Sequence, residues 1–71
     1  MRVVIKDRFL LERASKDITM RELSEKSQVP IGTISRAENG QSISIKSANK
    51  LCKALGQEFE ILFRIEEKKR E

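Results

Sequence analysis

The stretch V-P-I-G-T-I-S-R-A-E-N-G, residues 29–40, decides the fold class of this chain of 71 residues. It has few bulky side chains, a proline near its start and a glycine at its end. Pro30 suits the first position of a helix, where its missing N–H is not needed. Gly40 suits the left-handed residue that commonly closes a helix. The pattern therefore predicts a short, slim helix at residues 31–38.

The two sides of this expected helix differ in character. Ile34 and Ala37 lie three residues apart and would pack inward. Gly32, Thr33 and Arg36 would share the outward side. A helix that enters the DNA major groove, which is about 12 Å wide, needs outward residues that are slim or that reach base edges. The composition of the segment favours such a role.

The residues before this helix carry a strong helix-start signal. Thr19 and Glu22 have capping-box spacing, so that each side chain can bind a backbone N–H of the first turn. Ile18 and Leu23 stand where a hydrophobic staple would close over the cap. We therefore expect a helix at residues 20–27. Two short helices joined by a tight turn are the layout of a helix-turn-helix.

The remaining elements follow from hydrophobic periodicity and from turn residues. We expect a strand at 1–6, a helix at 8–16 capped by Asp7, a helix at 45–55 between Ser44 and Gly56, a strand at 58–66 and a frayed, charged tail at 67–71. The apolar stripe of the helix at 8–16 would be Phe9, Leu10, Leu11 and Ala14, and that of the helix at 45–55 would be Ala48, Leu51, Cys52 and Leu55.

Composition narrows the function classes. The chain has 15 basic and 11 acidic residues and a net charge of +4, with +5 in the first 57 residues. This distribution suits a polyanionic partner, although a solvated basic surface is the plain alternative.

With no histidine and a single cysteine, we expect no metal site, no cofactor, no internal disulfide and no enzyme activity. With neither a long apolar run nor a leader, we expect a cytoplasmic protein that does not bind membranes.

The segment T-M-R-E-L-S-E-K-S-Q-V-P-I-G-T-I-S-R-A-E-N-G, residues 19–40, resembles the phage-repressor (Cro-like, xenobiotic-response) helix-turn-helix proteins. The resemblance runs from about Phe9 to Gly56. It implies a mainly α, lambda-repressor-like helix-turn-helix bundle at residues 7–56, within a single DNA-binding domain of residues 1–71. The terminal strands would be additions that form a small sheet.

The resemblance also implies roles for individual residues. Arg13 matches a position that pairs with the glutamate of the E-N-G segment, here Glu38, and lies near a phosphate. Asn39 and Gly40 match a loop whose backbone holds phosphate. The residues expected at the DNA are Arg13, Met20, Arg21, Ile31, Gly32, Thr33, Arg36, Asn39 and Gln41.

This chain departs from the family pattern at three of those positions. Met20 occupies a site that is usually glutamine, and Ile31 and Gly32 replace long polar base readers. Arg36 is then the best candidate for a bidentate contact, most naturally with guanine. Two plainer interpretations stay open, namely that Ile31 is a core residue and that Arg36 is an ordinary surface arginine.

The terminal strands suggest how two copies would assemble. A lone strand is not stable, so the two amphipathic segments should pair with each other, either within a chain or across a dimer. In the second case the dimer contact would be made by Val3, Ile5, Phe59, Ile61, Phe63 and Ile65. In the first case the sheet would only cover the core of one monomer.

The leading functional hypothesis is a sequence-specific transcriptional regulator that binds a palindromic operator as a homodimer. A repressor of antitoxin or mobile-element type fits best, with a toxin or other regulatory protein as a further partner. The alternative is a protein-interaction module that keeps the fold but binds a partner protein rather than DNA.

Overall fold

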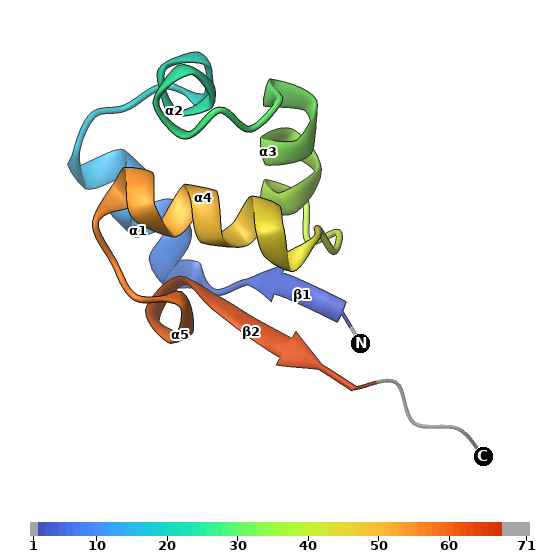
Figure 1. Cartoon of the computed structure of the whole chain (residues 1–71). Coiled ribbons are helices and arrows are strands. Elements are labelled where there is room, and N and C mark those ends of the chain that lie inside the picture. The colour runs from blue at the N-terminus through green and yellow to red at the C-terminus, as the bar shows by residue number, and fades with distance from the viewer. Residues whose placement is uncertain (1, 68–71) are drawn as a thin grey trace.

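The computed structural model describes residues 2–67, and Figure 1 shows a helical bundle above a small sheet. Met1 of the expected first strand and residues 68–71 of the expected tail lie outside the described residues. The elements are, in chain order, β1 (Arg2–Ile5), α1 (Asp7–Ser15), α2 (Met20–Ser27), α3 (Ile31–Glu38), α4 (Ile45–Leu55), α5 (Phe59–Leu62) and β2 (Phe63–Glu66).

The centre of the bundle lies where α2, α3 and α4 meet. Leu23 of α2, Ile34 of α3 and Leu51 of α4 are fully buried there. The expected stripe of α4 is confirmed, because all four of its members are buried. Cys52 is one of them and forms no disulfide. The core therefore fixes which side of α3 is left to face outward.

The predicted helix starts are confirmed at α2 and α4. The Glu22 N–H donates to the Thr19 hydroxyl at 3.1 Å, and the Thr19 N–H donates to the Glu22 carboxylate at 2.8 Å. Ser44 accepts a hydrogen bond from the Ser47 N–H at the start of α4. These local hydrogen bonds satisfy backbone donors that would otherwise have no partner.

Two expected caps are shifted by one residue. Lys6 is the N-cap of α1 and makes no side-chain cap, while Asp7 is the first helical residue. Pro30 is the N-cap of α3, with an extended ψ of 140°, and does not occupy the first helical position. Its carbonyl accepts the Thr33 N–H at 2.9 Å, so the proline still starts the helix without an N–H of its own.

The apolar stripe expected on α1 is wrong. Phe9 is buried, but Leu10, Leu11 and Ala14 are exposed, Leu11 at 63%. Glu12 is buried in their place. This is possible because Arg8 and Lys16, one turn away on either side, donate to the Glu12 carboxylate. The paired carboxylate can then lie against the protein.

The terminal strands form an antiparallel pair within the chain. The register places Val3 opposite Ile65 and Val4 opposite Arg64. β1 also makes an isolated antiparallel bridge from Val3 to Ile43, on the loop before α4. β1 is thus flanked on both sides, and β2 forms the outer edge of the sheet (Figure 1).

The strand expected at 58–66 begins only at Phe63, because Phe59–Leu62 forms the short helix α5. Adjacent Leu62 and Phe63 are both buried, at 0% and 1% exposed. In a strand these neighbours would point to opposite faces, whereas the helical turn of α5 brings Leu62 into the same core cluster as Phe63. The Phe63 ring lies 5.5 Å from the Phe9 ring and 5.4 Å from the Phe59 ring, between centroids.

The expected apolar face of alternating residues is therefore wrong as a single strand face. Phe63 and Val3 belong to the core of one chain, and Phe59 and Ile5 pack partly buried against it. The two expected dimer residues that stay exposed are Ile61 and Ile65.

Candidate nucleic-acid interface

The helix α3 is anchored by one face and leaves the other free. Ile34 and Ala37 are fully buried, as predicted. On the other side Gly32 and Arg36 are exposed, and Ile31 is 46% exposed. The exposure of Ile31 rules out the interpretation that it is a core residue. The free side of α3 therefore carries the apolar side chain of Ile31 and the cationic side chain of Arg36, with Gly32 contributing only backbone between them.

The turn between α2 and α3 is held by two serines. The Ser24 hydroxyl donates to the Val29 carbonyl at 2.6 Å. The buried Ser27 hydroxyl donates to the Leu23 carbonyl at 2.7 Å and accepts the Val29 N–H at 3.3 Å. Gln28 adopts the left-handed conformation with φ of 65°, which nothing in its residue type predicts. Both backbone groups of Val29 are thus satisfied within the turn, so the two helices keep a fixed relative position.

A partly buried ion pair ties the end of α3 to α1. The Arg13 Nε donates to Glu38 Oε2 at 2.6 Å, and its Nη2 donates to Glu38 Oε1 at 3.0 Å. The remaining Nη1 donates to the Ile18 carbonyl at 2.8 Å. The side chains of Arg13 and Glu38 are 23% and 10% exposed. A bidentate contact of this kind fixes orientation as well as distance, so the pair holds α3 in place.

The side chain of Arg36 lies along the outward side of α3. Its Nη2 donates to the Thr33 hydroxyl at 3.3 Å, and Thr33 itself is half-buried. A Cβ built on Gly32 would meet only the Arg36 Nη1, at 4.0 Å. The guanidinium thus lies over the first turn of α3, above the position that has no side chain.

These features match a known family. A family model described as helix-turn-helix, of the phage-repressor type, matches residues 11–62. The chain belongs to this family. No curated protein and no solved structure shows a significant match to the chain. Proteins of the family are DNA-binding regulators, so the chain is a DNA-binding helix-turn-helix regulator with α2 and α3 as its two helices.

The match also defines what this helix-turn-helix protein adds to its family. α5 lies inside the matched residues, whereas β1 and β2 lie outside them. The short helix that sequence periodicity missed is thus within the family core. The terminal strands are the additions, as expected.

The residues expected near DNA from α2 differ in accessibility. Arg21 is exposed, whereas Met20 is half-buried and packs against the core. A methionine at the first position of α2 contributes to packing, where a glutamine would present hydrogen-bonding groups. Arg21 is therefore the side chain of the first turn of α2 that is free to reach a phosphate.

The loop after α3, whose backbone is expected to hold phosphate, begins with three N–H groups that are bonded within the chain. The N–H groups of Asn39, Gly40 and Gln41 all donate to carbonyls of α3, at 3.0–3.1 Å. Gly40 has φ of 89°, the left-handed conformation that this helix end requires. These three backbone donors are thus paired within the chain, whereas the side chains of Asn39 and Gln41 are exposed.

Sequence reasoning missed the charge cluster around Glu12. The hydrogen bonds from Lys16 at 2.6 Å and from Arg8 at 2.9 Å lower the pKa of Glu12 to about 2 from its usual 4.5. The signal was present as basic residues four positions before and after Glu12, a spacing that places all three side chains on one helix face. The cluster holds one acid between two bases and has no counterpart on α3.

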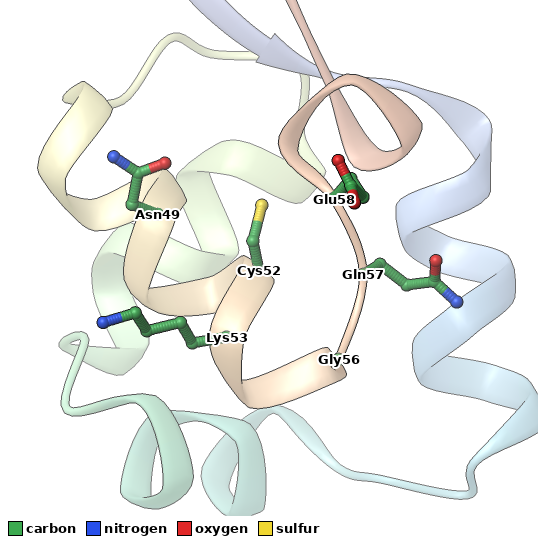
Figure 2. A pocket seen from close by; sticks show the side chains of 6 residues that line it. All are labelled: Asn49, Cys52, Lys53, Gly56, Gln57 and Glu58. Carbon is green, nitrogen blue, oxygen red and sulfur yellow. The ribbon is translucent and has the colours of Figure 1, made fainter.

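An open depression lies beside the C-terminal half of α4 (Figure 2). Its lining comes from α4 and from the connection to α5, namely Asn49, Cys52, Lys53, Gly56, Gln57 and Glu58. Burial raises the pKa of the Cys52 thiol, so the thiolate that nucleophilic chemistry requires is disfavoured.

Within residues 2–67 no cluster of three side chains suited to bind a metal is present, and no helix is long and apolar enough to cross a membrane.

Proposed function

We propose that the chain is a sequence-specific transcriptional repressor that inserts α3 into the major groove and acts as a homodimer on a palindromic operator. The observation that supports this most directly is the free side of α3, where Arg36 is exposed while Ile34 and Ala37 anchor the opposite side. The Arg13–Glu38 pair holds the helix in this orientation. A rigidly held helix with one free cationic side is suited to direct base readout.

Arg36 is the proposed base reader. A guanidinium can donate two parallel hydrogen bonds to the O6 and N7 atoms of guanine. Its contact with the Thr33 hydroxyl keeps it near the N-terminal turn of α3, the part of a recognition helix that meets base edges. Ile31 would add apolar contact with a thymine methyl group.

Gly32 supports the same assignment because the protein itself does not require a glycine there. The space around it is open, and its backbone is helical, a conformation that any residue can adopt. A glycine within a helix costs about 1 kcal/mol relative to alanine. Close approach of the α3 backbone to the DNA gives a reason for a glycine at this position.

Phosphate contacts would come from exposed side chains around α3. Arg21 lies on α2, and Asn39 and Gln41 follow α3. Such contacts position the protein without reading sequence. Arg13 is mainly occupied by Glu38 and Ile18, and Met20 is mainly occupied by packing, so their share in DNA binding is smaller.

The proposal places the protein in the cytoplasm, as a repressor of antitoxin or mobile-element type. The support for this type is the pair of terminal strands outside the family match, which gives the chain a surface for assembly. A toxin or other regulatory protein would then be a second partner beside DNA.

The proposal is tested by selecting bound sequences from a random duplex library and then titrating salt. We expect an enriched palindrome that binds more tightly than a scrambled duplex of the same length, and a logarithm of affinity that falls linearly with the logarithm of salt concentration. Arg21→Ala should make that slope shallower by about 1 on both duplexes, as a lost phosphate contact does. No enrichment, with weak binding of every duplex at all salt concentrations, would contradict the proposal.

A further inference from the structure

β2 offers a free backbone edge. β1 has β2 on one side and Ile43 on the other, whereas among residues 2–67 β2 pairs with β1 alone. Figure 1 shows β2 as the outermost element, running away from the bundle. An exposed strand edge presents N–H and C=O groups that can pair with another chain.

The hydrogen bonds of β1 show which residue of β2 points its backbone outward. The Val3 carbonyl accepts the Ile43 N–H at 3.0 Å, so the backbone of Val3 faces away from β2. The Lys6 N–H donates to the Leu62 carbonyl at 2.8 Å on the other side. Because backbone groups alternate in direction along a strand, the partner of Val3 in the register, Ile65, has its N–H and C=O on the free edge.

The charges of β2 distinguish between the ways in which two such edges can pair. A two-fold antiparallel pair centred on Arg64 would place two arginines opposite each other, and one centred on Glu66 would oppose two glutamates. A pair centred on Ile65 would place Arg64 opposite Glu66 of the partner subunit, twice. Opposite charges across a strand pair stabilise it, and like charges destabilise it.

We propose that the β2 edges of two copies of this chain pair antiparallel, centred on Ile65, and form a continuous sheet across a homodimer. This inference rests on the homodimer of the proposed function and specifies its joint. The N–H of each Ile65 would donate to the Ile65 carbonyl of the other copy, as in a hydrogen-bonded antiparallel pair. The two Ile65 side chains, each 46% exposed in the single chain, would lie next to each other.

The same contact would join the charges of four strands on one face. Arg2 lies 3.7 Å from Glu66 across the pair of strands within the chain, and Arg64 donates to Glu66 within β2 at 2.9 Å. In the dimer each Glu66 would also meet Arg64 of the partner subunit. All three side chains are accessible enough to make this contact, since Arg2, Arg64 and Glu66 are 49%, 56% and 38% exposed.

The test is a charge exchange between two variants, measured by sedimentation. Arg64→Glu alone and Glu66→Arg alone would each oppose like charges in a homodimer, so we expect dimer dissociation constants at least tenfold above that of the natural chain. An equimolar mixture of the two variants places opposite charges at both positions and should form a heterodimer with an affinity close to the natural one. Arg21→Glu, an exposed charge reversal on α2, should leave the dimer intact.

Rescue in the mixture separates the joint from a role within one chain. Each variant loses the attraction between its own residues 64 and 66, and mixing cannot restore a contact within a chain. Circular dichroism of each variant checks that the helices are formed. A natural chain that sediments as a monomer at 200 μM, variants that dimerise like the natural chain, or a mixture that stays monomeric would overturn the inference.

The outcome is independent of the DNA test. Failure of the charge exchange with a positive operator selection would reject this joint and leave DNA binding in place. Success of the charge exchange with a negative selection would reject DNA reading and leave the dimer in place.

Discussion

The two ends of this molecule expose different kinds of chemical group. At the α2–α3 end the backbone is satisfied internally, by the capping box, by the two serines around Val29 and by the hydrogen bonds that close α3. The groups at that end that stay accessible to a partner are side chains, above all that of Arg36. At the sheet end the side chains of Phe63 and Val3 lie in the core, and among residues 2–67 the outer backbone edge of β2 has no partner strand.

In the proposed function, this difference lets a small chain bind DNA and a second copy of itself through two separate surfaces. Side chains on a rigid helix can distinguish bases, because each base pair shows its own pattern of donors and acceptors in the major groove. A strand edge distinguishes little between partner sequences, because it binds another strand through regularly spaced backbone hydrogen bonds. We therefore assign DNA reading to α3 and assembly to β2.

The largest expected effect concerns the core role of the sheet end. Phe63→Ala removes a fully buried ring that packs between Phe9 and Phe59, and should lower the free energy of unfolding by about 3–5 kcal/mol. Ile65→Ala, two residues further on β2, removes a side chain that is half exposed and should cost much less. Urea denaturation measures both. Equal losses would show that the sheet end is not divided into a core residue and an edge residue.

The next effect concerns the anchoring of the recognition helix. Glu38→Ala leaves Arg13 without its bidentate partner, and should destabilise the fold by about 3 kcal/mol, the lower end of the range for a broken buried pair, because Arg13 keeps some contact with water. The matched control is Glu25→Ala on α2, an exposed glutamate with no ion pair among the described residues. A Glu38→Ala variant that unfolds at the same urea concentration as the control would contradict the anchoring role.

A smaller effect concerns pH and the Glu12 cluster. Because the pKa of Glu12 is lowered to about 2 in the folded chain, its ionised form stabilises the fold above a pH of about 4.5, and this contribution is lost as the pH falls toward 2. Glu12→Gln should therefore be less stable at pH 7 and should lose less stability between pH 5 and pH 2. Thermal melts across that range test this. Parallel pH curves for the two proteins would show that Glu12 titrates normally.

The α2–α3 end could be predicted from sequence because the residues that start and anchor its helices are close together in the chain. The capping box of α2 needs residues three apart, and the anchoring side of α3 follows from Ile34 and Ala37. The Arg13–Glu38 pair is a contact between distant elements, and it was expected only through the family resemblance. Local signals thus define the helices, and the resemblance supplied how they meet.

The sheet end was harder to predict because its structure depends on tertiary packing. The alternation of residues 59–65 is typical of a strand, yet residues 59–62 form a helical turn that brings Leu62 into the same core cluster as Phe63. The exposure of Leu10 and the burial of Glu12 on α1 likewise depend on what the rest of the fold covers. Hydrophobic period alone cannot show which of two apolar faces will be covered.

The central claim is that α3 reads sequence through Arg36, and the most direct measurement is the affinity of Arg36→Ala for the selected operator and for scrambled DNA. We expect a loss of about 1–3 kcal/mol on the operator, little loss on scrambled DNA and relaxed preference at one base pair in each half-site. Arg21→Ala, the matched arginine control, should weaken both duplexes equally. If Arg36→Ala also weakens both duplexes equally, Arg36 contacts phosphate and the claim is wrong.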